Sequence, residues 1–134
     1  MRFARGSSLG FLGRFGRSSD LRQIDEALRA VDVHPRLVSE AIKLTVARLL
    51  KEDHGDAEPA SEAYRRAAEL IGYCAVGADG FAATNDDDLA QAVEQRIEAA
   101  LDAPNSLDAR LVLLTIHAKA IQPSVVAAFG LESA

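Results

Sequence analysis

Apolar residues recur at intervals of three and four along most of the chain, which is the spacing of one face of an α-helix. The first clear stripe consists of Leu21, Ile24, Leu28 and Val31. We expect this helix to begin at Ser19 or Asp20, either of which can cap its first amides. Similar stripes predict further helices over residues 35–51, 59–76, 84–101, 107–121 and 123–129. The pattern therefore predicts an all-α fold, a compact single-domain bundle of five or six helices.

Prolines, glycines and a serine separate the stripes. Pro35 and Pro59 suit the first position of a helix, where the amide hydrogen that proline lacks is not needed. Gly77, followed by a second glycine three residues on, is expected to end the third helix. Ser106 is expected to cap the fifth helix, and Gly130 to end the sixth. The stripes of the second and fifth helices are the widest, so these two are predicted to form the centre of the bundle.

The N-terminal residues 1–19 differ from the helical domain predicted over residues 20–134. They form a Gly/Arg-rich arm that contains four arginines, four glycines, three of the five phenylalanines and no acid. Each glycine disfavours a helix by roughly 1 kcal/mol relative to alanine, so the arm is expected to be flexible unless something orders it. Two alternatives stay open: Phe11, Leu12 and Phe15 dock onto the body, or the arm is a disordered tail. Its charge also allows a weak contact with an anionic surface.

Charge and cysteine content narrow the class of protein. The formal net charge is -5, which argues against nucleic-acid binding by the body. No apolar stretch is long enough for a transmembrane segment. Cys74 is the single cysteine, so no disulfide framework is possible and a cytoplasmic location is expected. Because Cys74 lies in an apolar run, we interpret it as a buried small hydrophobic residue and not as a nucleophile.

The most distinctive segment is acidic. From Asp79 to Asp108 the chain has eight acids and one base, Arg96. Carboxylate clusters can hold a divalent cation, which makes Asp79 and Asp86 candidate metal ligands, although the spacing does not match an EF-hand loop. The alternative is that residues 86–88 only charge and cap the start of a helix, for which Thr84 is a candidate capping residue. We favour the capping interpretation.

The same segment resembles the TerB-like helical domain of tellurite-resistance proteins over about 35 residues. Ala78-Asp79-Gly80 matches an Ala-Asp-Gly turn that follows an apolar helix, and residues 86–88 match an acidic helix start. The resemblance implies a divalent-ion-binding stress-response module, with Asp79 and Asp86 as the inherited ligands. The chain departs from the family where a second such turn is expected, because His117-Ala118-Lys119-Ala120 stands there.

Enzymatic chemistry has little support in the sequence. No two of His34, His54 and His117 have helical metal-ligand spacing, and no nucleophile elbow, phosphate loop or dinucleotide fingerprint is present. We therefore favour a non-enzymatic protein-interaction module, with no cofactor, that acts through a protein partner or by self-association. The alternatives are the TerB-like module and a small enzyme. An interaction module predicts a contiguous exposed apolar patch, which we expect near the N-terminal arm.

Overall fold

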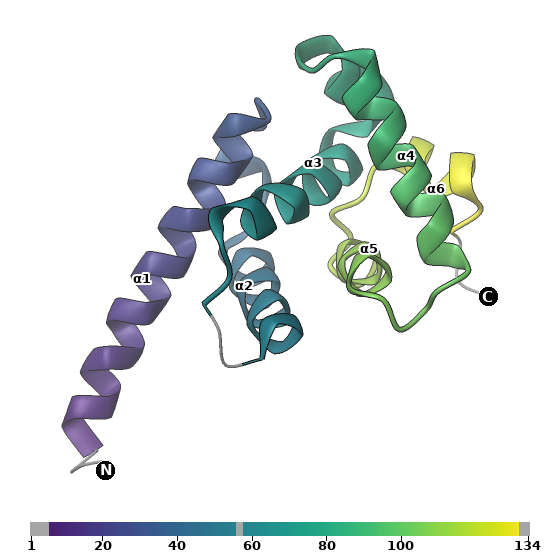
Figure 1. The fold of residues 1–134 in the computed structure, drawn as a ribbon. Coiled ribbons are helices and arrows are strands. Elements are labelled where there is room, and N and C mark those ends of the chain that lie inside the picture. The colour runs from purple at the N-terminus through teal and green to yellow at the C-terminus, as the bar shows by residue number, and fades with distance from the viewer. Residues whose placement is uncertain (1–5, 56–57, 132–134) are drawn as a thin grey trace.

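The computed structural model describes residues 6–55 and 58–131, with side chains from Arg17 onward. This part of the chain is all-α and contains no strand (Figure 1). Its elements are α1 (Gly6–Ala30), the 3₁₀ turn η1 (Pro35–Leu37), α2 (Glu40–His54), α3 (Ser61–Thr84), α4 (Asp87–Leu101), α5 (Leu107–His117) and α6 (Pro123–Phe129). The predicted compact helical bundle is confirmed. None of the described helices is long and apolar enough to cross a membrane.

The centre of the bundle is α3, not the second and fifth helices as predicted. It packs against each of the other five α-helices and crosses the middle of the molecule (Figure 1). Small residues such as Ala67, Ala68 and Gly72 are buried along it and allow neighbours to approach closely. A Cβ on Gly72 would lie 2.8 Å from a Val33 methyl carbon. The small size of the buried side chains therefore indicated which helix lies at the centre of the bundle better than the width of an apolar stripe did.

The first helix begins earlier than predicted. α1 starts at Gly6, so neither Ser19 nor Asp20 caps it. Asp20 instead accepts a hydrogen bond from Lys51 of α2, with the two atoms 2.8 Å apart. Once Arg17–Ala30 is held by tertiary contacts, extending an existing helix is easier than starting one, even through glycines. Whether Phe11, Leu12 and Phe15 dock onto the body lies outside the described side chains.

Three ion pairs connect α1 to α2. Two of them are partly buried and the third is exposed. The pairs are Asp25–Lys43 and Asp20–Lys51, each at 2.8 Å, and Arg17–Glu40 at 2.7 Å. Beneath them the apolar face of α2 is covered, since Ile42, Val46, Ala47, Leu49 and Leu50 are buried. The apolar face on the α1–α2 side, called the closed side below, is therefore covered, and the hollows that remain there are lined largely by charged residues.

Several helices begin within a few residues of the predicted start. Pro35 begins the short turn η1, and α2 begins later, where Ser39 accepts a hydrogen bond from the Ile42 amide. The cap of α4 is Asp86 and not Thr84. Ser106 caps α5 as predicted. These shifts of a few residues reflect a competition among neighbouring residues that can all accept a backbone amide.

Gly77 bends α3 instead of ending it. Its φ of 85° and ψ of 170° interrupt the helix, which then continues to Thr84. The bend leaves carbonyl groups of the first segment without helical hydrogen-bond donors. Gln122 donates hydrogen bonds to two of these carbonyls. Its backbone N–H donates to the Cys74 carbonyl at 2.8 Å, and its side-chain amide donates to the Ala75 carbonyl at 3.0 Å. The bend is thus joined to the start of α6.

The fifth helix is shorter than predicted. α5 ends at His117, and Lys119 adopts a left-handed φ of 57°. This turn brings residue Gln122 back to the bend in α3. α6 then ends at Gly130 in the left-handed conformation, as predicted, and Leu131 packs against the core.

A candidate protein-binding groove between α4 and α5

The two candidate metal ligands are not brought together with other ligands. Asp79 and Asp86 are both exposed, and Asp79 lies in the helical segment after the bend, not in a turn. The Asp86 carboxylate accepts the Leu89 amide at 2.7 Å. Within the described residues, no group of three His, Cys, Asp or Glu side chains is placed to hold a metal ion. Asp86 is therefore confirmed as a helix cap, and metal binding by Asp79 and Asp86 stays a prediction.

Cys74 is fully buried, which confirms its predicted place in the core. Burial raises the pKa of its thiol to about 11, so the thiolate required of a nucleophile is scarce at neutral pH. The three histidines lie at different places. His34 accepts the Arg36 amide beside η1, His54 lies at the end of α2, and His117 is exposed at the end of α5.

An open cavity of about 350 Å³ does contain a histidine beside acids, the arrangement expected of an enzyme. It lies where α2, α3 and α5 meet, and its lining includes His54, Asp53, Glu62, Arg66 and Arg96. The His54 Nδ1 atom lies 2.8 Å from the Leu50 carbonyl oxygen, so this nitrogen carries the proton and donates to that carbonyl. No hydroxyl or thiol side chain lines the cavity. The cavity therefore places a histidine beside carboxylate and guanidinium groups.

A second hollow is apolar and lies between α4 and α5. Its volume is about 370 Å³, and the residues Gly130 and Leu131 that follow α6 also line it. Two of the three large exposed hydrophobic residues in the described chain lie here: Leu101 is 53% exposed and Leu113 is 49% exposed. The lining residues are Ile97, Ala100, Leu101, Pro104, Ala109, Val112, Leu113, Ile116, His117, Gly130 and Leu131. We call this hollow the α4–α5 groove.

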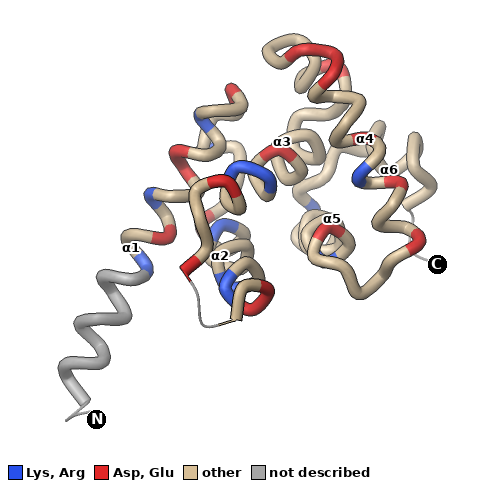
Figure 2. The backbone as a smooth tube through the Cα atoms, viewed as in Figure 1, with Lys and Arg blue, Asp and Glu red and all other residues tan. Residues whose placement is uncertain are grey.

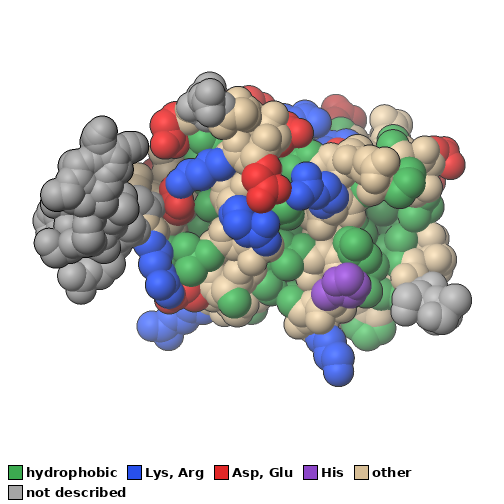
Figure 3. Space-filling model, turned by 90° about the horizontal axis from the view of Figure 1, so that it is seen from below, with side chains coloured by type: hydrophobic (Ala, Val, Ile, Leu, Met, Phe, Trp, Pro, Cys, Tyr) green, Lys and Arg blue, Asp and Glu red, His purple; other side chains and the backbone are tan. Residues whose placement is uncertain are grey.

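Hydrophobic side chains gather near the described C-terminal end on the face seen in Figure 3. The local cause is the apolar run of α5 from Leu111 to Leu114. Four consecutive helical residues cover nearly the whole circumference, so they cannot all face α3. Leu111 and Val112 are buried, whereas Leu113 is left outside. This run was visible in the sequence, but we interpreted it as a wide core stripe.

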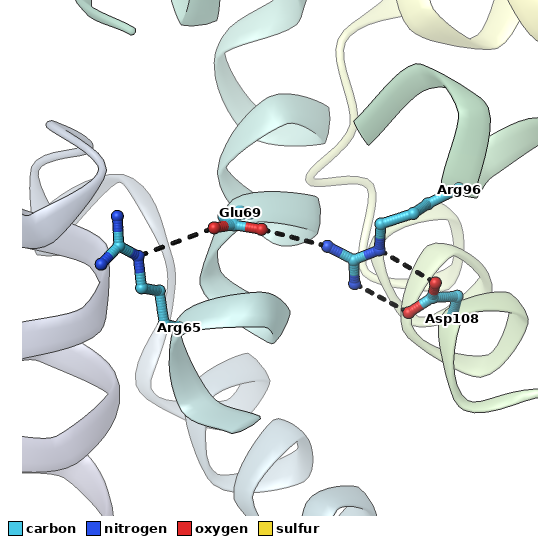
Figure 4. Close-up of polar contacts among 4 residues, drawn as sticks. All are labelled: Arg65, Glu69, Arg96 and Asp108. Atoms are coloured by element: carbon cyan, nitrogen blue, oxygen red, sulfur yellow. Dashed lines mark hydrogen bonds and ion pairs between the residues drawn. The ribbon is translucent and has the colours of Figure 1, made fainter. Parts of the chain in front are cut away.

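A four-residue ionic network joins α4 and α5, the helices of the groove, to α3 on the side of the other cavity (Figure 4). Arg96 of α4 donates two hydrogen bonds to Asp108 of α5, at 3.0 and 2.8 Å. It also donates to Glu69 of α3 at 3.3 Å, and Arg65 extends the network at 3.7 Å from Glu69. The bidentate geometry holds α4 and α5 at a defined separation on α3. The relative position of the two helices that form the groove is therefore fixed by hydrogen bonds as well as by apolar packing.

Comparison of the chain with protein-family models, with curated proteins and with solved structures finds no significant match in any of the three. The resemblance to the TerB-like domain thus stays a prediction. The fold and the groove are the features from which a function can be inferred.

Proposed function

We propose that this protein is a non-enzymatic interaction module, and that its α4–α5 groove receives the apolar face of a helix from a protein partner. The observation that carries the proposal is the half exposure of Leu101 and Leu113 on the two walls of one hollow. An isolated exposed leucine is ordinary, but two that share a concave apolar surface are typical of a binding site.

The size and chemistry of the groove suit a helix. A volume of about 370 Å³ lies within the range of small binding sites and holds a few large side chains. Amphipathic helices bind such grooves by apolar anchors spaced three and four residues apart. The groove lies on the α4–α5 side of α3, away from α1, so the patch is not near the N-terminal arm as we expected (Figure 1).

Photo-crosslinking tests the proposal and identifies the partner in one experiment. A photoreactive phenylalanine analogue replaces Leu113 in the full chain, and adducts formed in cells are identified by mass spectrometry. We expect a discrete protein adduct. The matched control places the same analogue at Leu37, which is 57% exposed but lies in η1. Adducts that are equal at both positions, or absent at position 113, would contradict the proposal.

A further inference from the structure

We infer that the occupant of the α4–α5 groove is the N-terminal segment of a second copy of this chain. This inference rests on the proposed function and assigns its partner. Three observations support it: the apolar and basic residues of the segment 8–17, the exposed acids beside Leu101, and the position of α1 relative to the groove.

The N-terminal segment has the pattern of a groove-binding helix. Helix α1 begins at Gly6, so residues 8–17 belong to it. Phe15 lies four residues after Phe11 and three after Leu12, which is the spacing of one helix face. Arg14 adds a positive charge to this segment, whereas Arg17 is already paired with Glu40 of α2 at 2.7 Å. Aromatic side chains are scarce elsewhere in the chain, and large aromatic anchors are the residues that dominate interface energies.

Exposed acids lie beside Leu101, a residue that lines the groove. Glu98 is on α4, three residues before Leu101, and Asp102, the C-cap of that helix, directly follows Leu101. Neither carboxylate belongs to an ion pair in the described part of the chain, whereas Arg96, the one base of α4, is bound to Asp108 and Glu69. Figure 2 shows acidic positions along α4 on both sides of its basic position, including positions toward its C-terminal end. An arginine-bearing segment without acids is therefore the complementary ligand.

The segment that would fill the groove belongs to a different copy. Helix α1 packs against α2 and α3, and α3 separates it from α4 and α6 (Figure 1). Because the helix is continuous from Gly6, reaching the groove of the same chain would require α1 to unwind. Reciprocal exchange between two copies needs no unwinding and forms a closed dimer with two identical contacts.

The experiment measures the mass of the full chain by light scattering over a range of concentrations. Wild type is expected to rise from 14.3 kDa toward twice that mass. Leu113→Asp breaks the groove, and the double variant F11S/F15S breaks the segment. Each variant alone is expected to remain a monomer. An equimolar mixture is expected to associate, because one copy still supplies a groove and the other a segment.

Two further variants serve as controls for the mass measurement. Leu37→Asp should dimerise like wild type, and Leu101→Asp should behave like Leu113→Asp; circular dichroism checks that each variant is folded. A monomeric wild type, a Leu113→Asp dimer, or a mixture that stays monomeric would overturn the inference. If crosslinking at position 113 then captures a different protein, the proposed function stands and only the identity of the partner is wrong. If it captures nothing, both are wrong.

Discussion

The two sides of the molecule use similar amphipathic helices and end with different surfaces. On the α1–α2 side, the apolar face of α2 is covered and charged side chains bridge the two helices. On the α4–α5 side, an apolar groove stays open between the helices. An amphipathic pattern specifies which face of a helix is apolar. The number of helices packed around that face determines whether all of its apolar side chains are buried.

The ionic interactions of the two sides also differ. The side chain of Arg96, which joins α4 and α5 to α3, is only 14% exposed, whereas that of Arg17, which joins α1 to α2, is 58% exposed. A partly buried, bidentate pair loses more when one partner is removed, since the remaining carboxylates are left without compensation. An exposed pair is screened by solvent and contributes little. The contacts of Arg96 thus differ from the α1–α2 pairs by their bidentate geometry and second carboxylate partner, since the side chain of Lys43, which pairs with Asp25, is also mostly buried.

The largest effect is expected from Arg96→Leu, which breaks the network on the groove side. It leaves Glu69 and Asp108 partly buried without their main partner and should lower the free energy of unfolding by about 2 to 3 kcal/mol. Urea denaturation measures this change. Arg65→Leu is the matched control, because Arg65 lies at the exposed end of the network and should cost no more than about 0.5 kcal/mol. Equal losses of unfolding free energy in the two variants would show that burial does not strengthen the contacts of Arg96.

Gly77→Ala is expected to have the next largest effect. The φ of 85° and ψ of 170° at Gly77 belong to a region that is essentially restricted to glycine, so alanine should cost about 2 kcal/mol. Gly130→Ala provides the comparison, because its φ of 63° and ψ of 40° are left-handed helical and should cost about 1 kcal/mol. Thermal unfolding monitored by circular dichroism ranks the two. A smaller loss at Gly77 would mean that the bend is not required.

Lys51→Met tests the closed side and should have a small effect. The Lys51–Asp20 pair is partly exposed, so its loss is expected to cost less than about 1 kcal/mol. The same urea measurement applies, repeated at high salt, where the difference from wild type should shrink. A cost as large as that of Arg96→Leu would remove the proposed contrast between the two sides.

At neutral pH the smallest effect is expected from the buried tyrosines, and it emerges only in alkali. Burial and the nearby Asp20 carboxylate raise the pKa of Tyr64 from 10 to about 12. A raised folded-state pKa gives a contribution that is complete below pH 10 and is lost as the pH rises from 10 toward 12. The free energy of unfolding should therefore fall above pH 10. Tyr64→Phe should show a shallower fall than wild type, and an identical slope would contradict the assignment.

Tyr73 supplies the corresponding group on the other side of the molecule. Its hydroxyl donates to Glu94 of α4 at 2.6 Å, and burial together with this carboxylate raises its pKa further than that of Tyr64. Tyr73→Phe should therefore also reduce the alkaline loss. Comparing the two variants by denaturation at pH 11 shows which side of the molecule is more sensitive to alkali.

Local signals in the sequence predicted local structure well. The helical periodicity predicted each described α-helix, Ser106 and Gly130 were correctly assigned as terminal residues, and Cys74 was correctly placed in the core. Periodicity and capping depend on residues only a few positions apart, so they can be seen without a fold. Predicted helix starts were less accurate where several polar residues compete, as at Thr84 and Asp86.

Tertiary structure decided what the local pattern left open. α3 became the centre because Gly72 and its small neighbours admit helices closely, and Gly77 bends the helix because Gln122 from distant sequence satisfies the freed carbonyls. Leu101 and Leu113 lie within the predicted helices 84–101 and 107–121, where nothing local distinguishes them from core residues. Whether an apolar side chain is covered depends on which helices surround it, and that arrangement is set by packing between segments far apart in the chain, which no local period records.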